Sequence, residues 1–124
     1  MRTPSFVGPF KMTDFSLHFP TGLAEPTLDD NVDVHIKLRD GRAFAVTFFT
    51  VSNLTTLMTR WGRTGECAHG LYVWATNMIV VQEISQAVIR RVAQDLVETG
   101  QIESVGHLIH SAEHVESTGS EMND

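Results

Sequence analysis

Hydrophobic and polar residues alternate most strictly in residues 32–39. Aliphatic side chains hold every second position there, and polar or charged side chains hold the others. This period of two predicts a strand with one buried and one solvated face. Asp40 and Gly41 follow, a preferred pair for a type I′ turn, because both central residues of that turn need positive φ. Residues 42–50 are rich in Phe, Val and Thr and predict the returning strand of a β-hairpin.

A first amphipathic helix is predicted after this hairpin. Apolar residues recur there with the spacing i, i+3, i+4 and i+7, at Leu54, Leu57, Met58 and Trp61. Ser52 and Asn53 are its N-cap candidates, and Gly62 and Gly65 supply its end.

A second helix is predicted after Ser85, which is a good N-cap residue. Ile84 before this cap and Ile89 inside the helix have the spacing of a hydrophobic staple. The buried stripe of the helix consists of Val88, Ile89, Val92 and Leu96. Gly100 ends the helix, and we expect a short helical turn within residues 101–110.

Shorter apolar runs predict the remaining strands. Residues 15–19 alternate and are ended by Pro20, whereas residues 20–31 contain two prolines, a glycine and several acidic residues and predict a loop. Residues 66–70 predict another loop.

The runs 71–75 and 78–82 are two short β segments around Thr76 and Asn77. They predict a second β-hairpin, with one long bent strand as the alternative.

The predicted order of elements is therefore β-ββ-α-ββ-α. This order favours an α+β fold, in which an antiparallel sheet of four to five strands carries two helices on one face. We expect a single domain over residues 14–110. Residues 1–13 predict a flexible N-terminal extension, and residues 111–124 predict a disordered acidic tail.

The charge balance argues against nucleic-acid binding. The formal net charge is −6, from 9 basic and 15 acidic residues, and no basic footprint dominates the sequence. The apolar runs are too short to span a bilayer, and the N-terminal residues lack the apolar core of a signal peptide. Cys67 is the single cysteine, which excludes an intrachain disulfide. These features favour a cytoplasmic protein.

An acidic stretch is the first candidate binding surface. Glu25, Asp29, Asp30 and Asp33 lie in or next to the loop at residues 20–31. The stretch lacks the central glycine and the final glutamate of an EF-hand loop, so it does not predict a calcium site. A solvated loop is the simpler interpretation, and an acidic contact for a basic partner is the functional one.

Two aromatic residues form the second candidate surface. Tyr72 and Trp74 share one face of the run 71–75. That face either lies under a helix or is a protein-binding surface, because exposed Tyr and Trp side chains are frequent hot spots of interfaces.

Three basic residues flank the Asp40–Gly41 turn: Lys37, Arg39 and Arg42. Gathered at one end of the hairpin, they would bind a phosphate or an acidic protein patch. The alternative interpretation is that they only keep an exposed strand soluble.

Metal binding and catalysis have weaker signals. On a continuous helix, His107, His110 and His114 would share a face that suits zinc or nickel, but a solvated tail is the plainer interpretation. Cys67 and His69 could act as a nucleophile and its base, but an incidental cysteine is more usual at this spacing. The sequence has no nucleotide-binding or zinc-protease motif. We therefore assign no catalytic residue, no metal site and no cofactor.

Three short motifs carry a resemblance to a known family: TFFT at residues 47–50, TGEC at 64–67 and YVWATNMIVV at 72–81. Over about residues 32–105 the chain resembles a family of small, largely uncharacterised bacterial α+β proteins. It departs from the family pattern at Val73 and at Thr76–Asn77, where the family has Phe and Ser-Asp. The family's small acidic format is similar to that of bacterial toxin-immunity proteins. The resemblance implies no activity that can be transferred.

Together these observations favour a non-enzymatic protein-binding module. Its most concrete version is an immunity or inhibitor protein that blocks a basic toxin encoded nearby. The alternatives are a small-molecule or phosphate-binding regulatory domain and, with less support, a minor enzyme that uses Cys67 and His69. An edge strand and the face of Tyr72 and Trp74 would also permit a homodimer. The candidate binding residues are Asp29, Asp30, Asp33, Lys37, Arg39, Arg42, Tyr72 and Trp74.

Overall fold

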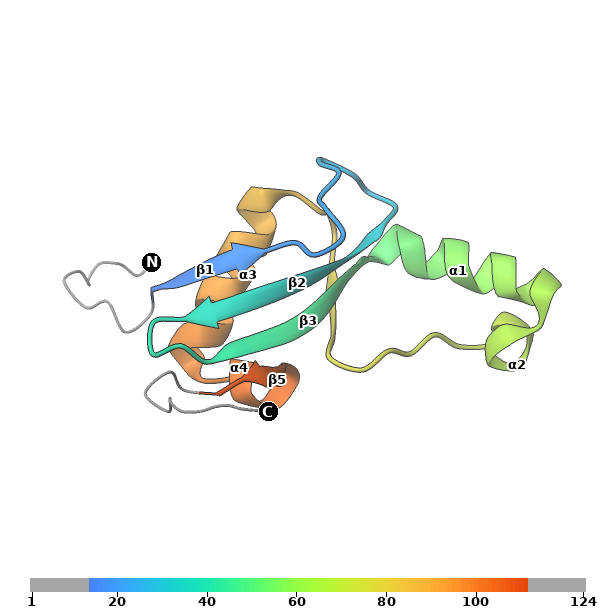
Figure 1. The fold of residues 1–124 in the computed structure, drawn as a ribbon. Coiled ribbons are helices and arrows are strands. Elements are labelled where there is room, and N and C mark those ends of the chain that lie inside the picture. The colour runs from blue at the N-terminus through green and yellow to red at the C-terminus, as the bar shows by residue number, and fades with distance from the viewer. Residues whose placement is uncertain (1–13, 112–124) are drawn as a thin grey trace.

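The computed structural model describes residues 14–111, which form five strands and four helical segments (Figure 1). In chain order these are β1 (Phe15–His18), β2 (Asn31–Leu38), β3 (Ala43–Thr50), α1 (Val51–Thr64), α2 (Glu66–Gly70), β4 (Met78–Val81), α3 (Gln86–Thr99), α4 (Ile102–Val105) and β5 (His107–His110). The α+β class expected from the sequence is confirmed. The expected extension at residues 1–13 and all but the first residue of the expected tail at 111–124 lie outside the described residues.

Strand β3 is the centre of the sheet because it pairs with three other strands, β2, β4 and β5. β2 runs antiparallel to it on one edge, and β1 continues the sheet antiparallel beyond β2. On the other edge, β4 pairs in parallel with Thr47–Thr50, and β5 pairs antiparallel with Ala43–Ala45. Two short strands thus share one edge of β3.

One face of the sheet is covered by α3 and α4 (Figure 1). The alternation predicted for residues 32–39 is confirmed, because the four aliphatic side chains of β2 are buried in this core. Their cross-strand partners Phe44, Val46 and Phe48 lie on the same face. From the helix layer, the core receives Ile89, Ala93, Leu96 and Ile102. The opposite face of the sheet carries mainly polar residues of β1 and β2.

The hairpin between β2 and β3 is confirmed, but the predicted type I′ turn is wrong. Gly41 has φ of +97°, whereas Asp40 is not among the residues with positive φ. The Gly41 amide donates to the Leu38 carbonyl at 3.0 Å, and the Leu38 amide donates to the Arg42 carbonyl at 2.7 Å. These bonds define a three-residue loop with a left-handed glycine, a common hairpin connection. The Asp40 carboxylate, which accepts from the Arg42 amide, favours this loop.

The predicted second hairpin is also wrong. Residues 71–77 contain no strand, and β4 pairs with β3 rather than with the segment before it. Asn77 has a left-handed backbone with φ of +57°, and its side-chain amide donates to the Val105 carbonyl at 2.8 Å. This bond helps to hold the start of β4 beside β3. The run 78–82 therefore pairs with β3, which is distant in sequence, and not with residues 71–75.

The helix predictions hold in position but not fully in packing. α3 begins at the Ser85 cap and ends at Gly100, and both Ile84 and Ile89 are buried as the staple requires. The predicted N-cap of α1 at Ser52 or Asn53 is wrong, because Thr50 caps the helix, whereas its end at Gly65 is confirmed. α1 does not lie on the sheet beside α3 (Figure 1). The expectation of these two helices on one face is therefore wrong for α1.

Residues 101–110 form the expected helical turn, α4, followed by an unexpected strand, β5. β4 is only four residues long and leaves half of the β3 edge unpaired. β5 occupies that half and satisfies its backbone groups. Within the described residues, no helix is long and apolar enough to cross a membrane.

We expect Ile36→Ala to destabilise the protein by about 2–5 kcal/mol, because Ile36 is fully buried in the core and its truncation leaves a cavity. Lys37→Ala is the matched control, since Lys37 is the next residue of β2 and lies on the exposed face. Its effect should stay within about 0.5 kcal/mol. Urea denaturation measures both, and equal effects would contradict the assignment of the two faces.

Candidate functional site

Residues 51–77 form a projecting arm, which consists of α1, α2 and the return segment 71–77. α1 continues from the end of β3 and leads away from the sheet, α2 lies at the far end, and the return segment leads back to β4 (Figure 1). Only Asn53 and Leu57 of α1 are buried, and no residue of α2 is. Neither the main core nor the residues packed against it include any part of the arm.

The arm begins at a hydrogen-bonded junction around Thr50. The fully buried Thr50 hydroxyl accepts from the Asn53 amide at 3.1 Å, and so caps the N-terminus of α1. The same hydroxyl accepts from the Asp30 amide at 3.2 Å, while the Thr50 amide donates to the Asp30 carbonyl at 3.0 Å. One residue therefore ends β3, starts α1 and holds the loop before β2.

Asp29 reinforces this junction from the outside. Its carboxylate accepts from the Asn53 side-chain amide at 3.0 Å and from the Thr56 hydroxyl at 2.8 Å. These hydrogen bonds, with the nearby Arg60 guanidinium, lower the pKa of Asp29 below its ordinary value of 3.8. The Asn31 side-chain amide donates to Oδ1 of the Asn53 side chain at 2.8 Å and completes the network. The first two turns of α1 are thereby fixed to the loop before β2.

The far end of the arm has a rare backbone conformation. Cys67, Ala68 and His69 are all left-handed, with φ between 50° and 59°, where the sequence predicted an ordinary loop. Left-handed helical geometry costs an L-residue roughly 1–2 kcal/mol. The turn closes through Gly70, where a Cβ atom would lie 2.1 Å from the Met58 carbonyl oxygen. Only glycine permits this close contact between α2 and α1.

Three large hydrophobic side chains of the return segment are exposed. Leu71 is 78% exposed, Tyr72 47% and Trp74 64%, whereas the intervening Val73 is half-buried. Met58 of α1 is also exposed. We call Leu71, Tyr72 and Trp74 the apolar strip. The expected face shared by Tyr72 and Trp74 is thus not under a helix, although the predicted strand that carried it does not form.

α1 has little intrinsic support for its helical form. Its sequence includes four threonines, Val51 and Gly62, all of which are weaker helix formers than Ala or Leu. Isolated helices of fewer than about 12–15 residues are marginal in water even with good formers, and α1 has 14 residues. Helices in proteins are stabilised mainly by packing of an apolar face. The arm of a single chain provides little of that packing.

The acidic residues predicted as a binding surface lie in two places. Asp29 and Asp30 are at the root of the arm, beside the exposed side chains of Leu28 and Val51. Asp33 is on the open face of the sheet, where its carboxylate accepts from the Thr47 hydroxyl at 2.9 Å. Both oxygens of Asp29 already accept hydrogen bonds within the chain, so part of the predicted surface has a structural role.

The three basic residues around the hairpin turn are not brought together. Arg42 lies on the helix side, where it pairs with Asp40 at 2.9 Å and with Glu103 of α4 at 2.8 Å. Arg39 lies 3.9 Å from Asp14, and Lys37 is on the open face, with no ion pair to any residue between 14 and 111. The arrangement does not form the converging cluster that a phosphate site needs.

Histidines gather on the open face of the sheet. Strand pairing aligns His18 with His35, His35 with Ala45, and Ala45 with His107. The rings of His18 and His35 have centroids 5.6 Å apart. His107 and His110 lie on β5 rather than on the helix considered from the sequence, and His114 is outside the described residues. No group of three or more His, Cys, Asp or Glu side chains in residues 14–111 could hold a metal ion.

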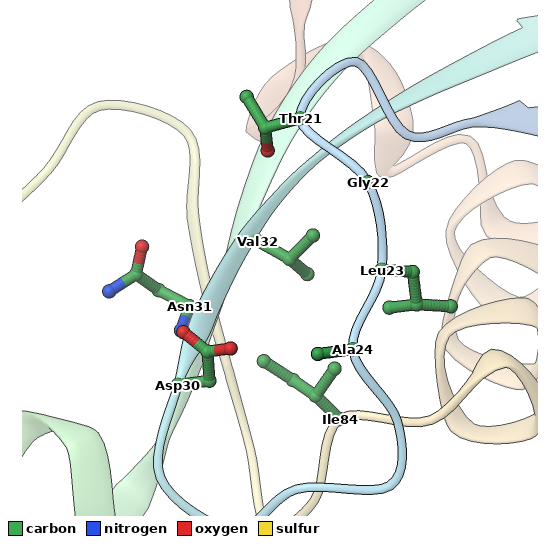
Figure 2. Close-up of a pocket in the computed structure, with 8 residues that line it drawn as sticks. All are labelled: Thr21, Gly22, Leu23, Ala24, Asp30, Asn31, Val32 and Ile84. Carbon is green, nitrogen blue, oxygen red and sulfur yellow. The ribbon is translucent and has the colours of Figure 1, made fainter.

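A cavity of about 440 Å³ lies between the loop at 21–24 and the start of β2 (Figure 2). Val32 and Ile84 point toward this loop, while Asn31 points to the other side of β2. Asp30 supplies the only charged side chain of the lining. No basic residue and no histidine lines the cavity, so the predicted phosphate-binding residues do not meet there.

No protein-family model matches the chain, and no curated protein or solved structure is similar to it at a significant level. The sequence indicated Tyr72 and Trp74, but it did not indicate Leu71 or the projecting position of α1. The spacing of Gly62, Gly65 and Gly70 was the available signal of a close backbone contact.

Asp29→Asn should weaken the protein in a pH-dependent way. Because folding lowers the pKa of Asp29, its carboxylate adds stability above about pH 3.8, and this contribution is lost as the pH falls through the folded-state pKa. The melting temperature of the variant should therefore lie below that of the wild type at pH 6 and approach it near pH 2.5. Asp95→Asn, on the exposed side of α3, is the control. If the difference in melting temperature between Asp29→Asn and the wild type stayed constant with pH, the stabilising role of the ionised Asp29 carboxylate would be contradicted.

Gly70→Ala should break the contact between α2 and α1 and expose the arm to protease, while Gly100→Ala should not. Both glycines have φ near +80°, so both variants carry the same backbone strain, but only at Gly70 would the new Cβ clash with α1. Trypsin cleavage after Arg60 and Arg63 reports the opening. We expect the cleavage rate of Gly70→Ala to exceed that of Gly100→Ala by at least about tenfold. Equal rates would show that the contact between α1 and α2 does not hold the arm together.

Proposed function

We propose that this protein is a non-enzymatic protein-binding module whose recognition element is the projecting arm. The observation that carries the proposal is the apolar strip of Leu71, Tyr72 and Trp74. These three large side chains are exposed on an arm that contributes no residue to the main core. Contiguous exposed apolar surface on a folded domain usually marks an interaction site. Trp and Tyr are the residues most often found at the energetic centre of such sites.

The rigid junction at Thr50 supports the same proposal. A binding element gains affinity when it is held in its bound orientation before association, because less conformational freedom is lost. The Thr50 hydroxyl and the Asp29 carboxylate fix the root of α1, and the Gly70 contact fixes the turn at its end. The strip is thus presented from a defined direction rather than from a loose loop.

Charge adds selectivity to this surface. The acidic residues Asp29 and Asp30 lie at the root of the arm next to the exposed Leu28. A partner that offers a basic group beside an apolar one would fit this root, and complementary charges speed association. An immunity or inhibitor protein of the bacterial cytoplasm, acting on a basic toxin, is the most concrete form of the proposal. A phosphate-binding domain has less support, since Arg39 and Arg42 are already ion-paired.

The test is site-specific photo-crosslinking from position 74 in cells, followed by titration of the purified partner. We expect crosslinks from a photoreactive residue at position 74 but not from one at position 91, because Arg91 is also exposed to solvent but lies on α3, outside the arm. Trp74→Ser should weaken the affinity for the purified partner by at least about 30-fold. Arg91→Ser is the matched control and should leave the affinity unchanged.

Two results would contradict the proposal. The first is that the photoreactive residue at position 74 crosslinks to no protein. The second is that the wild type and Trp74→Ser bind the crosslinked protein with equal affinity. Because both substituted side chains are exposed, circular dichroism should show the same fold for both variants.

A further inference from the structure

We infer that the arm binds the arm of a second copy of this chain. The inference rests on the proposed function of the arm as a protein-binding element, and it names a second copy, in place of a toxin, as the partner of the arm. In the arrangement we propose, the two arms lie antiparallel about a twofold axis, so that the far end of each arm meets the root of the other. A twofold axis makes the two contacts identical, as in most homodimers.

Charge complementarity is the first argument for a second copy. The arm carries Arg60 and Arg63 but only one acidic residue, Glu66. The rest of residues 14–111 carries ten acidic and five basic residues, and two of the acidic residues, Asp29 and Asp30, lie at the root of the arm. The chain therefore holds both halves of a complementary pair. Arg60 lies near Asp29 of its own chain, so antiparallel arms would place Arg63 of each copy beside the aspartates of the other.

Length is consistent with this arrangement. α1 has 14 residues and so is about 21 Å long. Arg63 is in its last turn, whereas Asp30 contacts the N-cap Thr50, and Asp29 contacts Asn53 and Thr56 in the first two turns. When two such helices lie side by side in opposite directions, the last turn of one is level with the first turn of the other. In the arrangement we propose, the two apolar strips lie between these two charge contacts.

The apolar area is the second argument. The exposed fractions of Leu71, Tyr72 and Trp74 leave roughly 400 Å² of mainly apolar surface. A standard interface buries about 800 Å² on each partner, with a polar rim around an apolar centre. The strip would supply the apolar centre of the interface. Met58, Arg63 and the root of the arm would supply the remaining buried area. Burial would also support α1, which lacks packing in a single chain.

Sedimentation equilibrium over about 5–200 µM tests the inference, a range that covers weak and standard homodimers. We expect the wild type to approach twice its chain mass of 13.8 kDa. The double variant Leu71→Ser/Trp74→Ser should weaken dimerisation by at least about 30-fold, because it removes the apolar centre. Arg91→Glu is the matched control for charge and should dimerise like the wild type.

A mixing experiment tests the antiparallel arrangement itself. Arg63→Glu alone and Asp30→Arg alone should each dimerise at least about tenfold more weakly, because like charges meet twice across the axis. When the two variants are mixed, one contact is reversed and the other is native, so a mixed dimer should form with nearly wild-type affinity. If the wild type dimerises but the mixture of the two variants does not regain the wild-type affinity, the antiparallel arrangement is overturned.

A wild type that stays at 13.8 kDa at the highest concentration would overturn the second copy as partner. That result leaves the proposed function standing if position 74 crosslinks to another protein. Conversely, the absence of any crosslink from position 74, to itself or to another protein, would remove both. The two failures are therefore distinguishable.

Discussion

The buried hydroxyl of Thr50 is the interaction on which the rest of the structure depends. It lies where the central strand ends and accepts two backbone amide protons, one from the first turn of α1 and one from the loop before β2. An unsatisfied amide buried at either place would cost about 1–3 kcal/mol. The hydroxyl therefore ties the sheet, the loop and the helix together. Because β3 runs straight into α1, the chain has to leave the sheet at this point, and residues 51–77 become an arm rather than a covering layer.

The arm combines three features that a single chain does not explain. It contains a left-handed turn of three non-glycine residues, a helix of weak helix formers and a strip of exposed apolar side chains. Each feature is unfavourable for an isolated chain, and strained conformations persist when their surroundings hold them in place. A protein partner that covers the arm would offset all three at once. Two antiparallel copies would do so and would also join the basic end of each arm to the acidic root of the other.

The sequence determined the parts of the fold that depend on local pattern. Strict alternation predicted β2, and apolar spacing with the Ser85 cap predicted α3. α1 was predicted from apolar spacing and its final glycine, but not from its N-cap, which is Thr50. It did not determine the partners of short strands, because four apolar residues such as 78–81 pair equally well with a neighbour or with a distant edge. It also did not separate a helix that covers a sheet from one that projects, since the apolar residues around Leu57 in α1 and around Ile89 in α3 recur with the same helical spacing. Tyr72 and Trp74 were predictable as candidate surface residues from residue type, whereas the exposure of Leu71 follows only from the path of the return segment.

Amide hydrogen exchange measured as a function of protein concentration tests the central claim most directly, namely that the arm depends on contacts outside its own chain. The amides of β3 should be protected equally at all concentrations, because their pairing lies within the chain. The amides of the second half of α1, beyond the turns that Thr50 and Asp29 fix, should exchange faster than those of β3 at low concentration and become more protected as the concentration rises, since binding stabilises what it covers. Protection of α1 that equals that of β3 and does not change with concentration would contradict the account.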